Sequence, residues 1–181
     1  LTTLAIVPLV LYAINIYGQG LYRKAIAYAT LKNYDKATVY YNRAYPILSD
    51  NASFLSSLAL MYYENKQYDK SIAVLLQAKP ISSNPSINML LGNNYKELRQ
   101  YDAAIREYSE VTYMIPSRLF PKYQIALIYK ELNDSVATFN KALEIVNMPV
   151  KVPSSATKTI KEEMQQIIDD YSAKNATFFN R

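Results

Sequence analysis

The chain has 181 residues, half of them hydrophobic, with a formal net charge of +5, which suffices for one packed domain or a short repeat array. It has no cysteine and no histidine, which excludes Cys/His metal sites, histidine-dependent nucleophiles and disulfides. With only three glycines, neither a β-rich fold nor a phosphate-binding glycine loop is expected, and we predict no metal and no cofactor.

Residues 1–17 form an apolar segment without a charged side chain. As a helix they would span about 25 Å, slightly less than the roughly 30 Å hydrocarbon core of a bilayer. We interpret this segment as the end of a transmembrane helix; the alternative is a buried helix that packs against the residues that follow. Arg23, Lys24, Lys32 and Lys36 come next. The positive-inside rule favours the cytoplasm for them, but one flank alone leaves the periplasmic side open.

A motif with a period of 33 to 34 residues follows the apolar segment. Tyr34-Asp35-Lys36-Ala37 recurs as Tyr68-Asp69-Lys70-Ser71 and as Tyr101-Asp102-Ala103-Ala104, and a weaker fourth copy ends at Thr138. A tyrosine stands nine positions before the small residue in all four copies: Tyr28, Tyr62, Tyr95 and Tyr129. Several positions that recur in register indicate a structural repeat. We interpret these tyrosines as core residues, and Asp35, Asp69 and Asp102 as helix caps.

Small residues also recur in phase, at Ala25, Ala59, Gly92 and Ala126 and at Ala37, Ser71, Ala104 and Thr138, with large residues at Tyr41, Leu75 and Tyr108. Two helices that cross at a short distance need small side chains where they touch and large ones where they diverge. The pattern resembles the tetratricopeptide (TPR) repeat, which has two antiparallel helices in about 34 residues. This resemblance implies an all-α fold, an α-solenoid of antiparallel helical hairpins in a right-handed superhelix.

We predict four repeats in residues 18–149, with approximate bounds 18–51, 52–84, 85–118 and 119–149. Residues 150–181 are predicted to be a capping helix and tail. The fourth repeat departs from the pattern because Ala142 stands where a large residue is expected. The capping helix is amphipathic, and its apolar face consists of Ile160, Met164, Ile167, Ile168 and Tyr171. Such a helix would cover the last exposed core of a solenoid.

Several stretches are more specific than a generic repeat. They are Tyr45-Pro46-Ile47-Leu48, residues 115–121, Met148-Pro149-Val150-Lys151-Val152, Ser155-Ala156-Thr157 and Glu162-Glu163-Met164. Over residues 20–170 the chain resembles the C-terminal TPR region of Bacteroidetes membrane proteins of the O-antigen ligase/polymerase family. In that family the chemistry belongs to the membrane portion, so no catalytic residue is transferred. The resemblance implies an envelope-polysaccharide pathway and a soluble, non-catalytic C-terminal appendage at the bacterial inner membrane.

A TPR array offers a concave surface to an extended ligand. From the repeat register we predict that a groove is lined by Tyr22, Arg23, Ser56, Ser57, Tyr63, Asn93, Lys96, Tyr123, Gln124 and Lys130. The expected partner is a protein or peptide, such as the membrane portion of the same protein or another component of the glycan pathway. The alternative is a free-standing adaptor unrelated to glycan assembly.

Two further functions are weighed and disfavoured. The carboxylate pairs Glu162-Glu163 and Asp169-Asp170 are of the kind that glycoside hydrolysis uses, but adjacent helical side chains point apart, so we predict no enzyme activity. Lys and Arg are dispersed among the acids instead of forming one stripe, so no nucleic-acid partner is predicted.

Overall fold

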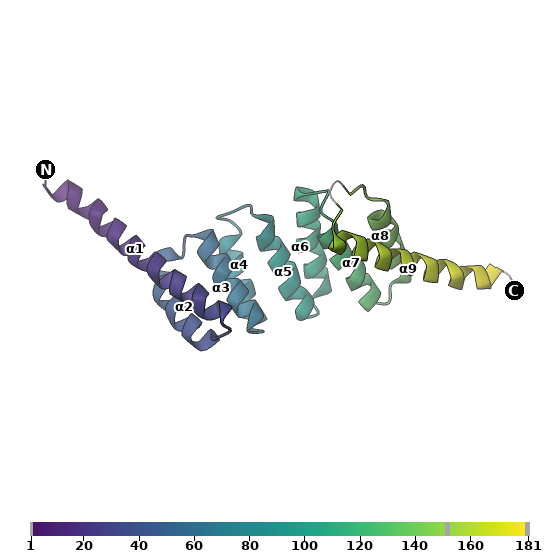
Figure 1. The fold of residues 1–181 in the computed structure, drawn as a ribbon, viewed down its shortest axis with the longest axis horizontal. Helices are drawn as coiled ribbons and strands as arrows, with labels where there is room; N and C mark the ends of the chain where they lie inside the picture. The colour runs from purple at the N-terminus through teal and green to yellow at the C-terminus, as the bar shows by residue number, and fades with distance from the viewer. Residues whose placement is uncertain (1, 151–152, 180–181) are drawn as a thin grey trace. The chain divides into compact units, whose positions relative to one another are not determined.

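The computed structural model describes the backbone of residues 2–150 and 153–179 and the side chains of residues 6–150 and 153–174. Leu1 of the apolar segment and Lys151 and Val152 of the quoted tail lie outside the described residues. The described chain is all-helical, as predicted (Figure 1). Its helices are α1 (Thr2–Thr30), α2 (Tyr34–Leu48), α3 (Ala52–Glu64), α4 (Tyr68–Ala78), α5 (Pro85–Glu97), α6 (Tyr101–Met114), α7 (Leu119–Glu131), α8 (Ser135–Asn147) and α9 (Ser155–Phe179).

The helices form two compact units, unit 1 (Leu1–Asn94) and unit 2 (Tyr95–Arg181). In unit 1, α1 pairs with α2 and α3 pairs with α4; in unit 2, α7, α8 and α9 pack in succession. A turn of three residues joins α1 to α2, α3 to α4 and α7 to α8, which makes the two helices of each pair antiparallel neighbours.

Small residues lie where the paired helices touch. Ala25, Ala59 and Ala126 are completely buried. In the second pair the Ser71 hydroxyl of α4 donates a hydrogen bond of 2.8 Å to the Ala59 carbonyl of α3, so the two backbones are in close contact here. Gly18 plays a similar part between α1 and α2, because a Cβ at this position would lie 2.7 Å from Cγ2 of Ile47. A larger side chain at this position would require Ile47 to shift.

The turn inside each helical pair closes in the same way four times. Lys32, Lys66, Arg99 and Asn133 all have φ between 55° and 58°, the left-handed conformation that ends many helices. In each turn the next residue donates its N–H to the carbonyl of the recurring tyrosine, as Gln67 does to Tyr62 at 2.8 Å. The rings of these tyrosines, Tyr28, Tyr62, Tyr95 and Tyr129, are only partly buried. The prediction that they are core residues is therefore wrong for their rings, whereas their carbonyls close the turns.

The predicted aspartate caps also differ from the structure. Asp35, Asp69 and Asp102 lie in the first turn of α2, α4 and α6. A negative charge there interacts favourably with the helix dipole, but these residues are not the N-caps of their helices. The residue that caps α2 is Asn33, whose side chain accepts from the Lys36 N–H. Asp134 does the same for α8.

In unit 2, α9 covers the open side of α8. The buried cluster contains Leu119 and Ala126 of α7, Ala142 and Ile145 of α8, and Ile160 and Met164 of α9. The small Ala142 leaves room for this packing, and Phe139 stacks on Tyr171 of α9 with ring centroids 4.4 Å apart. The Lys161 ammonium donates to the carbonyls of Val146 and Met148, which satisfies acceptors at the end of α8.

The N-terminal half of α1 projects beyond the neighbouring helices (Figure 1). Every residue from Ile6 to Tyr17 is exposed, including Leu9 at 66% and Tyr12 at 67%. We call residues 6–17 the apolar stub. Within the described residues, no helix combines the length and the hydropathy needed to cross a membrane.

Ala59→Leu tests the close contact between α3 and α4. We expect it to lower the free energy of unfolding by about 1–3 kcal/mol, because the site has no free volume. Ala73→Leu, at an exposed position of α4, is the control and should change stability by less than about 0.5 kcal/mol. Urea denaturation measures both variants. Equal stability of the two would show that Ala59 does not lie at a tight contact.

Lys66→Gly tests the left-handed turn. Relief of the strained conformation, about 1–2 kcal/mol, exceeds the entropy that glycine adds to the unfolded chain. We therefore expect a gain of about 0.5–1 kcal/mol in the same measurement. Ala73→Gly, inside α4, should instead cost about 1 kcal/mol. A loss of stability in Lys66→Gly would contradict the positive φ of Lys66.

Candidate functional site

An open groove of about 330 Å³ lies between α1 and α3 in unit 1. We call it the α1–α3 groove. Its lining residues are Ile26, Ala29 and Thr30 of α1, Lys32 of the turn, Tyr34 and Tyr41 of α2, and Ser57, Leu60, Met61 and Glu64 of α3. On each wall helix, Ile26 or Ser57 is followed by lining residues three and four positions later, so the lining residues of a helix share one face.

The groove is mostly apolar, with polar groups at its rim. Ile26 is 39% exposed and Leu60 is 48% exposed, so an aliphatic surface remains open to a ligand. Met61 and Tyr41 are buried beneath it. Burial, reinforced by the nearby Tyr22, raises the pKa of Tyr41 above its ordinary value, so its hydroxyl stays neutral. The groove therefore suits an apolar side chain rather than a charged group.

Of the predicted groove residues, only Ser57 lines the α1–α3 groove. The Tyr22 hydroxyl lies 2.6 Å from the Ser57 hydroxyl and donates to the Ser53 carbonyl, while its ring packs edge-on against Phe54. Tyr22 thus joins α1 to α3.

The other predicted residues of unit 1 are scattered. Arg23 is exposed and does not line the groove. Ser56 lines a separate polar hollow near Asn84. The Tyr63 ring packs against Tyr68, with centroids 5.7 Å apart, and Asn93 is partly buried.

In unit 2 the predicted residues bind one another or α9. The Lys96 ammonium donates to the Gln124 side chain at 3.0 Å. The Tyr123 hydroxyl donates to Glu163 of α9 at 2.7 Å; burial, followed by this contact, raises the pKa of Tyr123 to about 12. Lys130 is exposed and lines a hollow beside α9.

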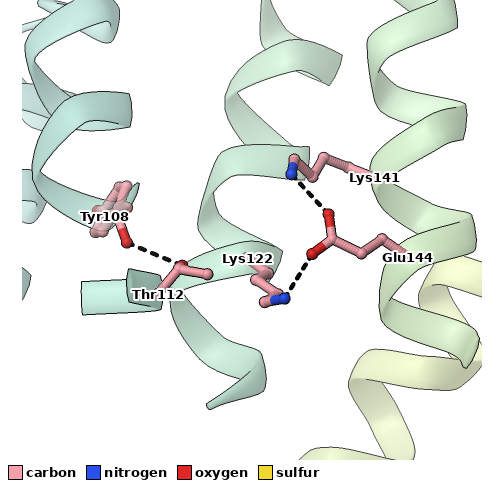
Figure 2. Close-up of polar contacts among 5 residues, drawn as sticks. All are labelled: Tyr108, Thr112, Lys122, Lys141 and Glu144. Carbon is pink, nitrogen blue, oxygen red and sulfur yellow. Dashed lines mark hydrogen bonds and ion pairs between the residues drawn. The ribbon is translucent and has the colours of Figure 1, made fainter. Parts of the chain in front are cut away.

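A charged cluster in unit 2 was not predicted from the sequence. Figure 2 shows that Lys122 of α7 and Lys141 of α8 each reach one carboxylate oxygen of Glu144. Burial raises the pKa of Glu144, but the hydrogen bonds and charges of the two lysines outweigh it, and the net pKa lies below its ordinary value. Glu144 is thus an ionised bridge between α7 and α8. Lys122 also lines a largely apolar hollow of about 680 Å³, formed with Phe120, Pro149 and Ile160 among others.

The carboxylates of α9 have separate partners. Asp169 accepts from Gln165 and Asp170 from Gln166, while Glu162 lies 3.7 Å from the Lys158 ammonium. No group of three or more acidic side chains that could hold a metal ion occurs among the described residues.

Two family models match the chain. Residues 19–80 match YpiA-like, C-terminal tetratricopeptide repeats, and residues 85–118 match a tetratricopeptide repeat. No curated protein matches.

Solved structures resemble the chain in fold. One crystal structure of MamA has a TM-score of 0.68 and 13% identity, covering 89% of this chain and 94% of that one. MamA of AMB-1 has a TM-score of 0.65 and 13% identity, covering 87% and 86%. The hetero-tetramer Cut9–Hcn1 of the APC/C has a TM-score of 0.63 and 16% identity. That match covers 81% of this chain but only 29% of the other chain. At such identities the likeness concerns the fold alone.

None of these matches bears on the resemblance to O-antigen ligases. They agree with the helical pairs and the recurring turns described above, and they support a protein-interaction domain. The chain therefore carries tetratricopeptide repeats, and its fold is that of an all-helical, TPR-like solenoid.

Proposed function

We propose that this chain is a non-catalytic protein-interaction module that holds a peptide segment in the α1–α3 groove. The observation that carries the proposal is the open aliphatic surface of Ile26 and Leu60, placed on a TPR fold. TPR domains commonly bind protein partners, and helical grooves bind peptides through a few apolar anchors.

The chemistry of the groove defines the ligand. An aliphatic or aromatic side chain of the peptide fits between Ile26 and Leu60, above the buried Met61. Lys32 and Glu64, with opposite charges, belong to the same lining, so residues that flank the anchor can be polar. The predicted groove residues of unit 2 remain candidates for further contacts.

We also propose that the module is the C-terminal appendage of an inner-membrane protein in envelope polysaccharide assembly. The exposed apolar stub supports attachment to a membrane, because exposed apolar surface of this extent marks an interaction site. The resemblance of residues 20–170 to the O-antigen ligase/polymerase family supports the pathway. A partner would then be the membrane portion of the same protein or another pathway component.

Panning a random peptide library, displayed on phage, against the full chain tests the groove. Selected peptides should share an aliphatic or aromatic anchor. Leu60→Glu should weaken their binding at least roughly ten-fold, because it places a charge against the apolar anchor. Leu76→Glu is the matched control: Leu76 is about equally exposed, at 50%, but lies on α4 outside the groove. Equal effects of the two variants would rule out the groove as the binding site.

Immunoblotting of fractionated native cells, with an antibody raised against this chain, tests the appendage. We expect a species in the membrane fraction that is much heavier than 20.7 kDa. A species of about this mass in the soluble fraction would contradict the proposal and would favour a free-standing adaptor.

A further inference from the structure

The positive charge of the chain is concentrated on its first helical pair. Residues 1–48 contain the cations Arg23, Lys24, Lys32, Lys36 and Arg43 and a single acid, Asp35. This gives +4 of the total +5, and leaves +1 for residues 49–181. The interpretation of the charge as evenly dispersed therefore does not hold for α1 and α2.

Three of these cations lie near the base of the apolar stub. The Arg43 guanidinium of α2 donates to the hydroxyl of Tyr17, the last stub residue, at 2.7 Å. Arg23 and Lys24 follow Tyr17 on α1 by six and seven positions, or about 9–10 Å along the helix. All three side chains are exposed, and none forms an ion pair with the described part of the chain. We call Arg23, Lys24 and Arg43 the basic collar.

The other two cations lie farther away on the same pair of helices. Lys32 follows Tyr17 by fifteen positions, about 22 Å along the axis. Lys36 lies over the Tyr28 ring at 5.4 Å, at a level about 16 Å from Tyr17. Lys24 makes the equivalent contact with Tyr40 at 5.8 Å. The pair Arg23 and Lys24 thus differs from the pair Lys32 and Lys36 mainly in its distance from the stub.

Apart from Asn15, the stub is apolar around its whole circumference. Exposed side chains such as Leu9, Val10, Leu11 and Tyr12 occupy consecutive positions, so they point in all directions around the helix axis. A protein groove or a second copy of the chain would cover one face and leave the others in water. A helix that is hydrophobic all round is suited to an apolar medium that surrounds it.

We propose that the apolar stub enters the hydrocarbon of a bilayer and that the basic collar binds anionic lipid headgroups. This inference rests on the proposed attachment to a membrane and names the class of lipid that strengthens the attachment. The stub is about 18 Å long and so accounts for part of the roughly 30 Å hydrocarbon core. Tyr17 then lies at the interface, where tyrosine is enriched.

Distance explains why only the collar takes part. Attraction to an anionic surface falls off within a Debye length, about 8–10 Å in physiological salt. With Tyr17 at the interface, Arg43 is adjacent to the headgroups, and Arg23 and Lys24 are about one Debye length away. Lys32 and Lys36 lie beyond this range. Apolar insertion and a basic cluster together provide the two signals that stable anchoring requires.

Flotation of the full chain with lipid vesicles tests the inference. The probes are vesicles of pure phosphatidylcholine and vesicles of the same lipid with roughly one-third phosphatidylserine, a composition that supplies anionic headgroups. We expect binding to both and tighter binding to the anionic vesicles. The double variant Arg23→Gln with Lys24→Gln should weaken binding to anionic vesicles roughly three- to four-fold, because both cations lie about one Debye length from the headgroups, and should leave binding to neutral vesicles unchanged.

The matched control is Lys32→Gln with Lys36→Gln, which also removes two charges and one lysine–tyrosine contact. It should weaken binding to anionic vesicles less than about two-fold. Equal binding of the unmodified chain to both kinds of vesicle would contradict the binding of anionic headgroups by the basic collar. Equal losses of binding in the two double variants would contradict it as well. Neither result would contradict membrane attachment. Failure to bind either vesicle would contradict membrane attachment itself, and would point to a protein as the partner of the stub.

Discussion

Close contact between paired helices at small, buried residues is the constraint on which the rest of the structure depends. Because Ala59 of α3 is completely buried against α4, the neighbouring positions of α3 must face elsewhere. Leu60 and Glu64 consequently lie on the side that faces α1 and line the α1–α3 groove. The groove therefore follows from the helix contact: the residues that are too large for the crossing form the surface available to a ligand.

The repeated turn adds a second constraint, because it fixes where each helix of a pair ends. In all four turns the residue with positive φ is a lysine, an arginine or an asparagine, although glycine would adopt this conformation with less strain. The carbonyl of the recurring tyrosine accepts the closing bond in each case. That role belongs to the backbone and requires no particular side chain. The recurrence of tyrosine must therefore reflect its partly buried ring, as in the stack of Tyr28 on Tyr40 at 5.3 Å.

The fold could be predicted from the sequence because core positions repeat independently of tertiary detail. The candidate site could not, since its geometry depends on contacts between distant residues. Tyr22 has the right register for a groove. Its hydroxyl, however, forms a hydrogen bond with the hydroxyl of Ser57, 35 positions later, and this bond holds Tyr22 between α1 and α3. The basic collar could not be predicted from the sequence for the same reason. Arg43 is 26 positions from Tyr17 in the chain, and only the pairing of α1 with α2 brings its guanidinium to the stub. Spacing along one helix is visible in a sequence, whereas contacts across a helix pair are not.

The continuity of α1 links the two proposed surfaces of unit 1. The stub and the wall residues Ile26, Ala29 and Thr30 belong to one helix, Thr2–Thr30. Ile26 follows Tyr17 by nine positions, which places the start of the groove about 13 Å along the axis from the end of the stub. A chain anchored by its stub would hold the groove at this height above the lipid surface, next to the basic collar. The peptides best placed to reach it are then segments that leave the same membrane, which agrees with a partner in the membrane portion of the same protein or of a neighbouring one.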